Sequence, residues 1–459
     1  MEKVTTAMNM NINPFSYLLY PFQIMEGYID DFTNNTATWK SGVVTTEHLD
    51  DKYREGVIYP YFQDIFCAFV GNPTKESQLP LVVKSLIVRD GDENDKWVEK
   101  TLCLETSQKS VEFGVCTKNN SFDSIKLVID NSSNIGLLIV PISIKSEIDE
   151  LCEFLYKIRR SDDRCIWKKG EDRNNKWCLG SKIDSLLQDF KGKYVFFNQN
   201  IALHYSFIVS NSNEIDNKTE NEIIALANGL KSSDLVVNDE KKTIKRIGNG
   251  QFVASSIEGT VVYTQWNKAF GGNGILDYRK IQTERYMIFI VVFMQRFSLL
   301  GLAQQIVSFD NRLEKLEKQK KRIDNEKVLN LLREVVGSFS HIQAKNRFTF
   351  ISGLTEHNTF YQICFTSFGI SDLYKEISEK ATLLNSILTQ KKDKKHEDVA
   401  WKLSIILAIL TVTSAANDIL EITEKIPGGN RPYIWFFGYL VLVAFVSMVF
   451  YKIIDIIRR

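Results

Sequence analysis

The chain has 459 residues, with 57 Lys or Arg against 56 Asp or Glu, and its formal net charge is +1. This length leaves room for two or three domains, and the balanced charge excludes the global positive field that would favour a nucleic acid polymer as partner. The seven cysteines are widely spaced and contain no C-x-x-C pair, which argues against a zinc site and favours reduced, mostly buried thiols.

Residues 1–275 are expected to form a mixed α/β domain. The first 25 residues lack the basic start and unbroken apolar stretch of an export signal, so this domain is expected in the cytoplasm. Amphipathic patterns at 146–160 and 220–230 predict helices that cover a sheet. Apolar or alternating runs between Asn, Gly and Asp clusters predict strands at 81–88, 100–105, 125–130, 135–144, 194–198, 203–210 and 259–266.

A segment within this domain, residues 162–178, mixes basic and aromatic side chains. Its cations could bind the phosphate of a nucleotide, and a base could stack on one of its tryptophans. The alternative is a solvated loop with no ligand. The candidate ligand-binding residues are Arg164, Trp167, Lys168, Lys169 and Trp177.

Signatures of catalysis are missing from the sequence. No G-x-x-x-x-G-K loop occurs, and neither G-N-G at 248–250 nor G-G-N-G at 271–274 has a strand-to-helix setting. No nucleophile elbow is found, and no His/Cys cluster indicates a catalytic metal. We therefore predict a protein that is not an enzyme and has no resident cofactor. Its histidines are expected to be surface or core residues: His48, His204, His341, His357 and His396.

Residues 276–400 are expected to form a stalk of long helices, because the stretch lacks proline and has strong helical character. A break near residues 352–360 predicts a turn and an antiparallel return. The apolar run 287–294 is followed by Gln295 and Arg296, which favours a helix buried in the soluble domain over a third membrane span. Two coiled-coil seams are expected, the first at Phe309, Leu313, Leu316, Lys320 and Ile323, the second at Leu373, Ile377, Ala381, Leu384 and Leu388.

Residues 401–459 are expected to form a transmembrane hairpin. Neither 403–416 nor 433–451 contains a charged side chain, and aromatic residues flank the second run as they do at membrane interfaces. Lysines precede the first run and basic residues follow the second, so both termini are expected on the cytoplasmic side of the inner membrane. A buried soluble hairpin is the alternative.

The first span reaches full length only if the helix continues through Asn417 and Asp418. Polar side chains are costly in lipid, so these two residues become candidates for lining a pore. Helical spacing places Thr411, Ser414 and Asp418 along one face, where their oxygens would suit a hydrated divalent cation. The alternative is that the membrane ends before Asn417, which then lies among the headgroups.

This order of parts resembles the CorA family of divalent-cation channels. The loop Gly428-Gly429-Asn430 stands just before the second span, where that family carries Gly-Met-Asn, with Gly429 in place of the Met. The resemblance implies an α+β protein with a helical stalk and a two-helix hairpin, assembled as a homopentamer in the lipid bilayer. It also implies that Asn430 contacts a hydrated Mg²⁺ or similar ion at the pore entrance.

Two other functions remain open from the sequence. The altered loop and the large N-terminal domain favour a divergent member that is opened by a nucleotide messenger, like the CorA-like effectors of some type III CRISPR antiviral systems. A plainer alternative makes the hairpin an anchor for a binding module without a pore.

Overall fold

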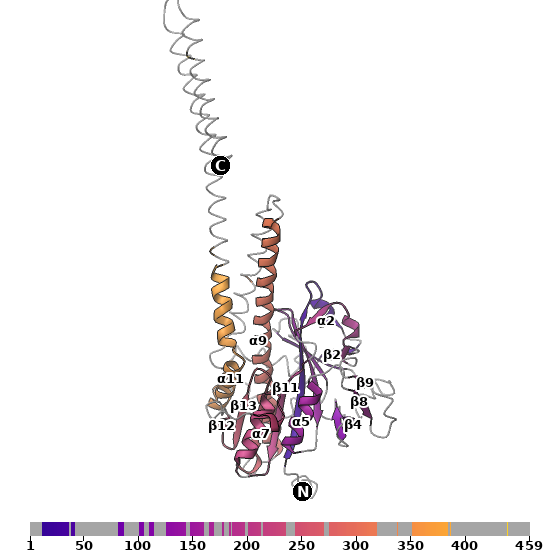
Figure 1. Cartoon of the computed structure of the whole chain (residues 1–459), viewed down its shortest axis with the longest axis vertical. Coiled ribbons are helices and arrows are strands. Elements are labelled where there is room, and N and C mark those ends of the chain that lie inside the picture. The colour runs from indigo at the N-terminus through magenta and orange to yellow at the C-terminus, as the bar shows by residue number, and fades with distance from the viewer. Residues whose placement is uncertain are drawn as a thin grey trace, which may run out of the picture. The chain divides into compact units, whose positions relative to one another are not determined.

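The computed structural model describes residues 12–35, 38–41, 81–86, 101–104, 110–113, 125–143, 147–159, 165–168, 177–178, 183–184, 186–197, 201–212, 214–235, 244–269, 275–318 and 351–383, with isolated positions at 337, 386 and 438 (Figure 1). The chain divides into two compact units, Met1–Thr382 and Leu383–Arg459. The expected hairpin falls in the second unit and lies outside the described residues, apart from Gly438.

The first unit is a mixed α/β structure built on one hydrogen-bonded sheet. Its main path runs β12-β13-β14-β11-β1-β7-β5-β4-β8-β9, with β10 beside β1 and with β6, β3 and β2 branching from β7. Neighbours are antiparallel except β11 and β14, which are parallel. The strands are β1 (Ile12–Ile24), β2 (Trp39–Ser41), β3 (Leu81–Leu86), β4 (Thr101–Leu104), β5 (Ser110–Phe113), β6 (Lys126–Asp130), β7 (Ile135–Ser143), β8 (Cys165–Lys168), β9 (Trp177–Cys178), β10 (Tyr194–Phe196), β11 (Leu203–Ser210), β12 (Lys245–Gly248), β13 (Gln251–Ser255) and β14 (Gly259–Gln265).

The predicted strands and helices of this domain are confirmed. All seven predicted runs fall on strands, namely β3, β4, β6, β7, β10, β11 and β14. Both predicted helices are present as α5 (Ile148–Arg159) and α7 (Asn217–Ala227). The G-N-G run at 248–250 forms the tight turn of the β12–β13 hairpin, where Gly250 has a φ of +66°. It is therefore a strand-to-strand turn rather than a phosphate loop.

The central strand β1 was not predicted from the sequence. It lies between β7 and β11, yet it contains two prolines, which lack the N–H that a sheet ladder needs. Pro14 pairs only with β11, because the β7 register begins at Phe15. Pro21 lies where pairing passes from β11 to β10, and its carbonyl accepts from the Phe197 N–H at 3.1 Å. Each proline thus occupies a position at which one neighbouring ladder is interrupted.

Helices cover both faces of the sheet. On one face, α5 and α7 pack with alternate β1 residues such as Leu18 and Phe22 in a continuous hydrophobic core. On the other face lies α9 (Ile275–Lys318), whose Tyr286 ring centroid is 4.6 Å from that of Tyr17. The central strands are buried on both faces, which explains why their sequences are continuous apolar runs.

The apolar run 287–294 lies inside α9 and is buried, with exposed fractions of 0 to 3%. Within the described residues, Ile281–Ser308 is the one helical stretch long and apolar enough to cross a membrane, and 83% of its most apolar window is buried within the protein. The prediction of a buried helix at 287–294 is confirmed. The apolar character of this stretch is accounted for by contact with the sheet.

Helix α11 (Thr355–Ser367) lies beside α9 (Figure 1). Contacts pair the two helices in ascending order, from Arg285 with Glu356 to Phe293 with Phe368, so they run in the same direction. The predicted break at 352–360 corresponds to the bend that ends at Leu354. The orientation of α11 relative to the segment just before residue 351 lies outside the described residues.

A second break in this region was not predicted. The turn at Phe368 and Gly369, where Gly369 has a φ of +63°, separates α11 from a further helical stretch at 370–383. In that stretch Ile377 and Ala381 of the expected seam are buried. Leu384 and Leu388 lie outside the described residues, as do the last two positions of the first seam, Lys320 and Ile323.

A candidate functional site between the sheet and the helices

The residues predicted for the pore all lie outside the described residues: Thr411, Ser414, Asn417, Asp418, Gly428, Gly429 and Asn430. Of the candidate nucleotide-binding residues, Arg164 and Lys169 also lie outside them. Trp167 and Lys168 belong to β8, and Trp177 belongs to β9. In the register Trp177 pairs with Ile166 and Trp167 with Cys103, so the two tryptophans are not cross-strand partners. A ligand-binding role for Trp167 and Trp177 remains a prediction.

The structure instead reveals a groove of about 870 Å³ between the sheet and the helices. The sheet contributes residues such as Leu203 of β11, and the β13–β14 turn contributes Ile257 and Glu258. One wall is α9 from Arg296 onward, and residues of the 370–383 helix, Glu376 and Lys380, complete it. The groove therefore joins the α/β core to the helix that precedes the expected first membrane span in the sequence. We call it the α9 groove.

Arg296 is a cation of the α9 groove that is held in place by a hydrogen bond and two aromatic rings. Its Nη1 donates to the carbonyl oxygen of Ile257 at 2.9 Å, and its guanidinium carbon lies 5.7 Å and 5.6 Å from the ring centroids of Phe297 and Phe368. Burial lowers the pKa of Arg296, against a smaller opposing effect of Glu258. An arginine guanidinium is nevertheless protonated throughout the physiological pH range, so the side chain keeps its charge in this partly dry position.

The carboxylates near Arg296 have other partners. Glu258 forms an ion pair with Arg159, whose side chain is nearly fully buried and whose Nε donates to the carbonyl of Ala202 at 2.6 Å. Glu376 forms an i,i+4 ion pair with Lys380 at 2.5 Å. Among the described residues, no carboxylate forms a hydrogen bond with Arg296.

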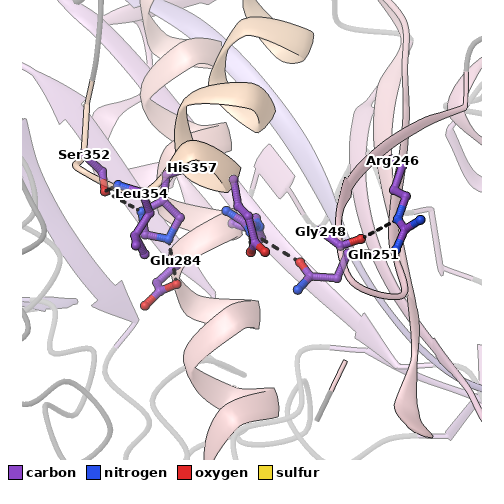
Figure 2. Close-up of polar contacts among 9 residues, drawn as sticks. Arg246, Gly248, Gln251, Glu284, Ser352, Leu354 and His357 are labelled. Carbon is purple, nitrogen blue, oxygen red and sulfur yellow. Dashed lines mark hydrogen bonds and ion pairs between the residues drawn. The ribbon is translucent and has the colours of Figure 1, made fainter. Parts of the chain in front are cut away.

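A second polar group, which we call the α9–α11 clasp, fixes the start of α11 to α9 and the β12–β13 hairpin (Figure 2). His357 lies between two partners, with its Nε2 at 2.9 Å from the Glu284 carboxylate and its Nδ1 at 3.0 Å from the Ser352 hydroxyl. All three side chains are buried.

The clasp continues to the hairpin through Arg285. Its Nη2 donates to Glu356 at 3.1 Å and to the side-chain oxygen of Gln251 at 3.3 Å. A Cβ at Gly248 would lie 2.6 Å from the Glu356 carboxylate, so the absence of a side chain at Gly248 leaves the space that this carboxylate occupies. The contacts thus tie α9, α11 and the sheet edge together.

The Ser352–His357–Glu284 order resembles a nucleophile, base and acid, but its surroundings do not suit catalysis. Ser352 is 1% exposed, and its oxygen already accepts the N–H of Leu354 at 3.0 Å. A nucleophile needs substrate access and a base that can take its proton toward a reacting carbonyl. We interpret the clasp as a structural connection, in agreement with the expectation that His357 is a core residue.

Other reactive groups in the described part of the chain are also buried. Cys152 and Cys364 are free thiols, as predicted, and burial raises the pKa of Cys364 to about 12. No group of three or more His, Cys, Asp or Glu within the described ranges is placed to hold a metal ion. Sequence patterns had not indicated the α9 groove, because its residues come from distant segments that share no motif.

Comparison of the chain with protein-family models, with curated proteins and with solved structures gives no match. The function must therefore be inferred from the residues and the geometry.

Proposed function

We propose that the chain is a CorA-like homo-oligomeric channel for divalent cations such as Mg²⁺, gated by its α/β domain. The observation that carries this proposal is that the 370–383 helix lines the α9 groove together with α9 and the sheet, while the α9–α11 clasp fixes the start of the preceding helix α11. In the sequence the 370–383 helix is followed by a lysine-rich segment and then by the uncharged run 403–416. A change in the domain would therefore be transmitted to the start of the first span.

In this proposal the hairpin spans the inner membrane with both termini in the cytoplasm, and five copies surround a pore. Thr411, Ser414, Asn417 and Asp418 line it, and the Gly428-Gly429-Asn430 loop forms its entrance. Oxygen ligands match hard divalent ions, and a partly hydrated ion is cheaper to bind than a stripped one. A pore made from two spans per chain requires several subunits around an axis.

The first test is the native mass of the detergent-solubilised protein. A pentamer supports the channel and justifies Mg²⁺ flux measurements in proteoliposomes, in which Asp418→Ala and Asn430→Ala are expected to reduce flux at least tenfold. Thr355→Ala, at the start of α11, is the matched control. A monomer or dimer would exclude a central pore and leave the membrane-anchored binding module as the better explanation.

A second candidate is a membrane effector opened by a nucleotide messenger. The α9 groove favours it, because a concave site with a fixed arginine lies against the helix that precedes the first span. A ligand that binds two arrangements of these helices with different affinity would shift the population between them. Messenger-dependent leakage of liposomes, without flux in its absence, would favour this candidate over a constitutive cation channel.

A further inference from the structure

We propose that the α9 groove binds a small organic anion, a phosphate ester or carboxylate with a flat apolar body, through the guanidinium of Arg296. The inference deepens the proposed function by naming the chemical class of its regulator, and the regulatory role rests on that function. The binding itself does not.

The anionic end of the ligand is specified by the hydrogen bonds of Arg296. Nη1 is occupied by the Ile257 carbonyl, whereas buried Nε has no hydrogen-bond partner. Nε and Nη2 share one edge of the guanidinium, and two parallel N–H groups on one edge match the two oxygens of a carboxylate or phosphate. A buried donor without a partner is costly, so a bound anion would remove an existing penalty.

The charge balance of the groove favours an anion over a cation. Both of its carboxylates, Glu258 and Glu376, are already in ion pairs with Arg159 and Lys380. Arg296 therefore supplies the excess charge among the described groove residues. Because Phe297 and Phe368 lie beside the guanidinium, water screens it less than it would an exposed arginine.

The rest of the groove suits a flat apolar body. The rings of Phe197 and Phe297 lie 5.0 Å apart between centroids, tilted by 60°, and both line the groove together with Leu300. The volume of about 870 Å³ lies in the range of sites that enclose drug-sized ligands. An aromatic phosphate or carboxylate of that size would contact the rings and Arg296 together.

The probe is 1-naphthyl phosphate, and its neutral counterpart is 1-naphthyl glucoside. Binding to the full chain in phosphatidylcholine nanodiscs is measured by equilibrium dialysis with naphthyl fluorescence, against empty nanodiscs. We expect saturable binding of the phosphate and at least tenfold weaker binding of the glucoside. Arg296→Met keeps the apolar stem and is expected to weaken phosphate binding about 10- to 100-fold, the usual effect of losing charged hydrogen bonds.

The matched control is Arg246→Met, which removes an exposed arginine that bonds the Gly248 carbonyl outside the groove. This variant should bind as the wild type does. Leu300→Trp fills the groove without changing its charge and should also abolish binding, which keeps the test decisive if Arg296→Met fails to fold.

Three results would overturn the inference: no saturable binding of the phosphate by the wild type, equal binding of the two probes, or full binding by a folded Arg296→Met or Leu300→Trp variant. Loss of probe binding in nanodiscs that contain phosphatidylglycerol would identify a lipid headgroup as the occupant instead. Probe binding without Mg²⁺ flux would support the ligand site in the α9 groove and contradict the proposed channel. Mg²⁺ flux without probe binding would support the channel and contradict the ligand site.

Discussion

His357 links α11 to α9 through its contact with Glu284, and its removal would leave the Glu284 carboxylate in a nearly dry site. An unpaired buried polar group costs about 1–3 kcal/mol, and more when it is charged. We therefore expect His357→Ala to accelerate amide hydrogen exchange at residues 355–360 by about 10- to 100-fold, since each 1.4 kcal/mol is tenfold in opening.

The control for this exchange measurement is Glu356→Ala on the same helical turn. The Glu356 side chain is 47% exposed, and its partner Arg285 retains the bond to Gln251. Because the Glu356 carboxylate is partly solvated and Arg285 keeps a partner, exchange rates should rise less in this variant than in His357→Ala. Equal acceleration of amide exchange in the two variants would show that the His357–Glu284 contact stabilises the start of α11 no more than the Arg285–Glu356 contact does.

His204 is the second residue whose environment makes a measurable prediction. Complete burial and the nearby Arg159 charge hold the pKa of His204 well below its ordinary value of 6.5. Below pH 6.5 the unfolded chain takes up a proton at this histidine while the folded protein does not. The stability is thus fully present above pH 6.5 and is lost as the pH falls toward the folded pKa.

The test compares thermal unfolding of the wild type and His204→Gln between pH 7.5 and 5.5. One proton corresponds to about 1.4 kcal/mol per pH unit, so the wild type should lose stability on acidification more steeply than the variant by that amount. Parallel pH dependences would mean that His204 titrates with the same pKa in the folded and unfolded states.

At the scale of the elements, the pairing of β1 with β7 depends on a glycine beneath an aromatic ring. Phe22 pairs with Gly136, and a Cβ on Gly136 would lie 2.2 Å from ring atoms of the fully buried Phe22. Overpacking of this kind costs about 1–3 kcal/mol. Gly136→Ala should lower the unfolding temperature by several degrees. In the double variant with Phe22→Leu, the smaller leucine side chain leaves room for the added methyl group, so Gly136→Ala should cost less stability there.

A purely additive double variant would contradict this explanation. Additivity is expected only for sites that do not touch, so it would indicate that the cost arises from the glycine backbone instead.

Strands with an uninterrupted apolar run could be predicted from the sequence, whereas a strand that contains prolines could not. The apolar runs of β7 and β11 predict strands because both faces are buried. Strand β1 was missed because Pro14 and Pro21 argue against a central strand, and the interruptions in its ladders become visible only with its neighbours in place.

The candidate site illustrates the same limit. Gln295 and Arg296 interrupt the apolar run of α9, and this interruption correctly argued against a membrane span. The position of Arg296 in a groove could not be predicted, because the groove is formed with Ile257 and the 370–383 helix, which lie far from Arg296 in the sequence.

For the whole molecule, the number of membrane crossings determines where the two ends of the chain lie. Two spans place them on the same side, whereas a third span through α9 would place them on opposite sides. In the proposed channel the hairpin supplies two spans, and the burial of the 287–294 run against the sheet argues against α9 as a third. Reporter fusions at either terminus should both be active as cytoplasmic fluorescent proteins and inactive as exported alkaline phosphatase.

A fusion at Arg459 that is active only as alkaline phosphatase would contradict this topology. It would imply an odd number of crossings and would reopen α9 as a membrane segment.

The position of β1 in the sheet also determines the delay between the synthesis of this strand and the synthesis of the strands it pairs with. Ser16 on this strand is hydrogen-bonded to Ser206, 190 residues further along. At a synthesis rate of about 5–20 residues per second, the first strand is made roughly 10–40 s before its β11 partner. The other neighbour of β1, strand β7, is made earlier, so β1 has no partner strand until β7 emerges and only one until β11 follows. Efficient production of this protein should therefore depend on chaperones that bind the largely apolar N-terminal strand as it leaves the ribosome.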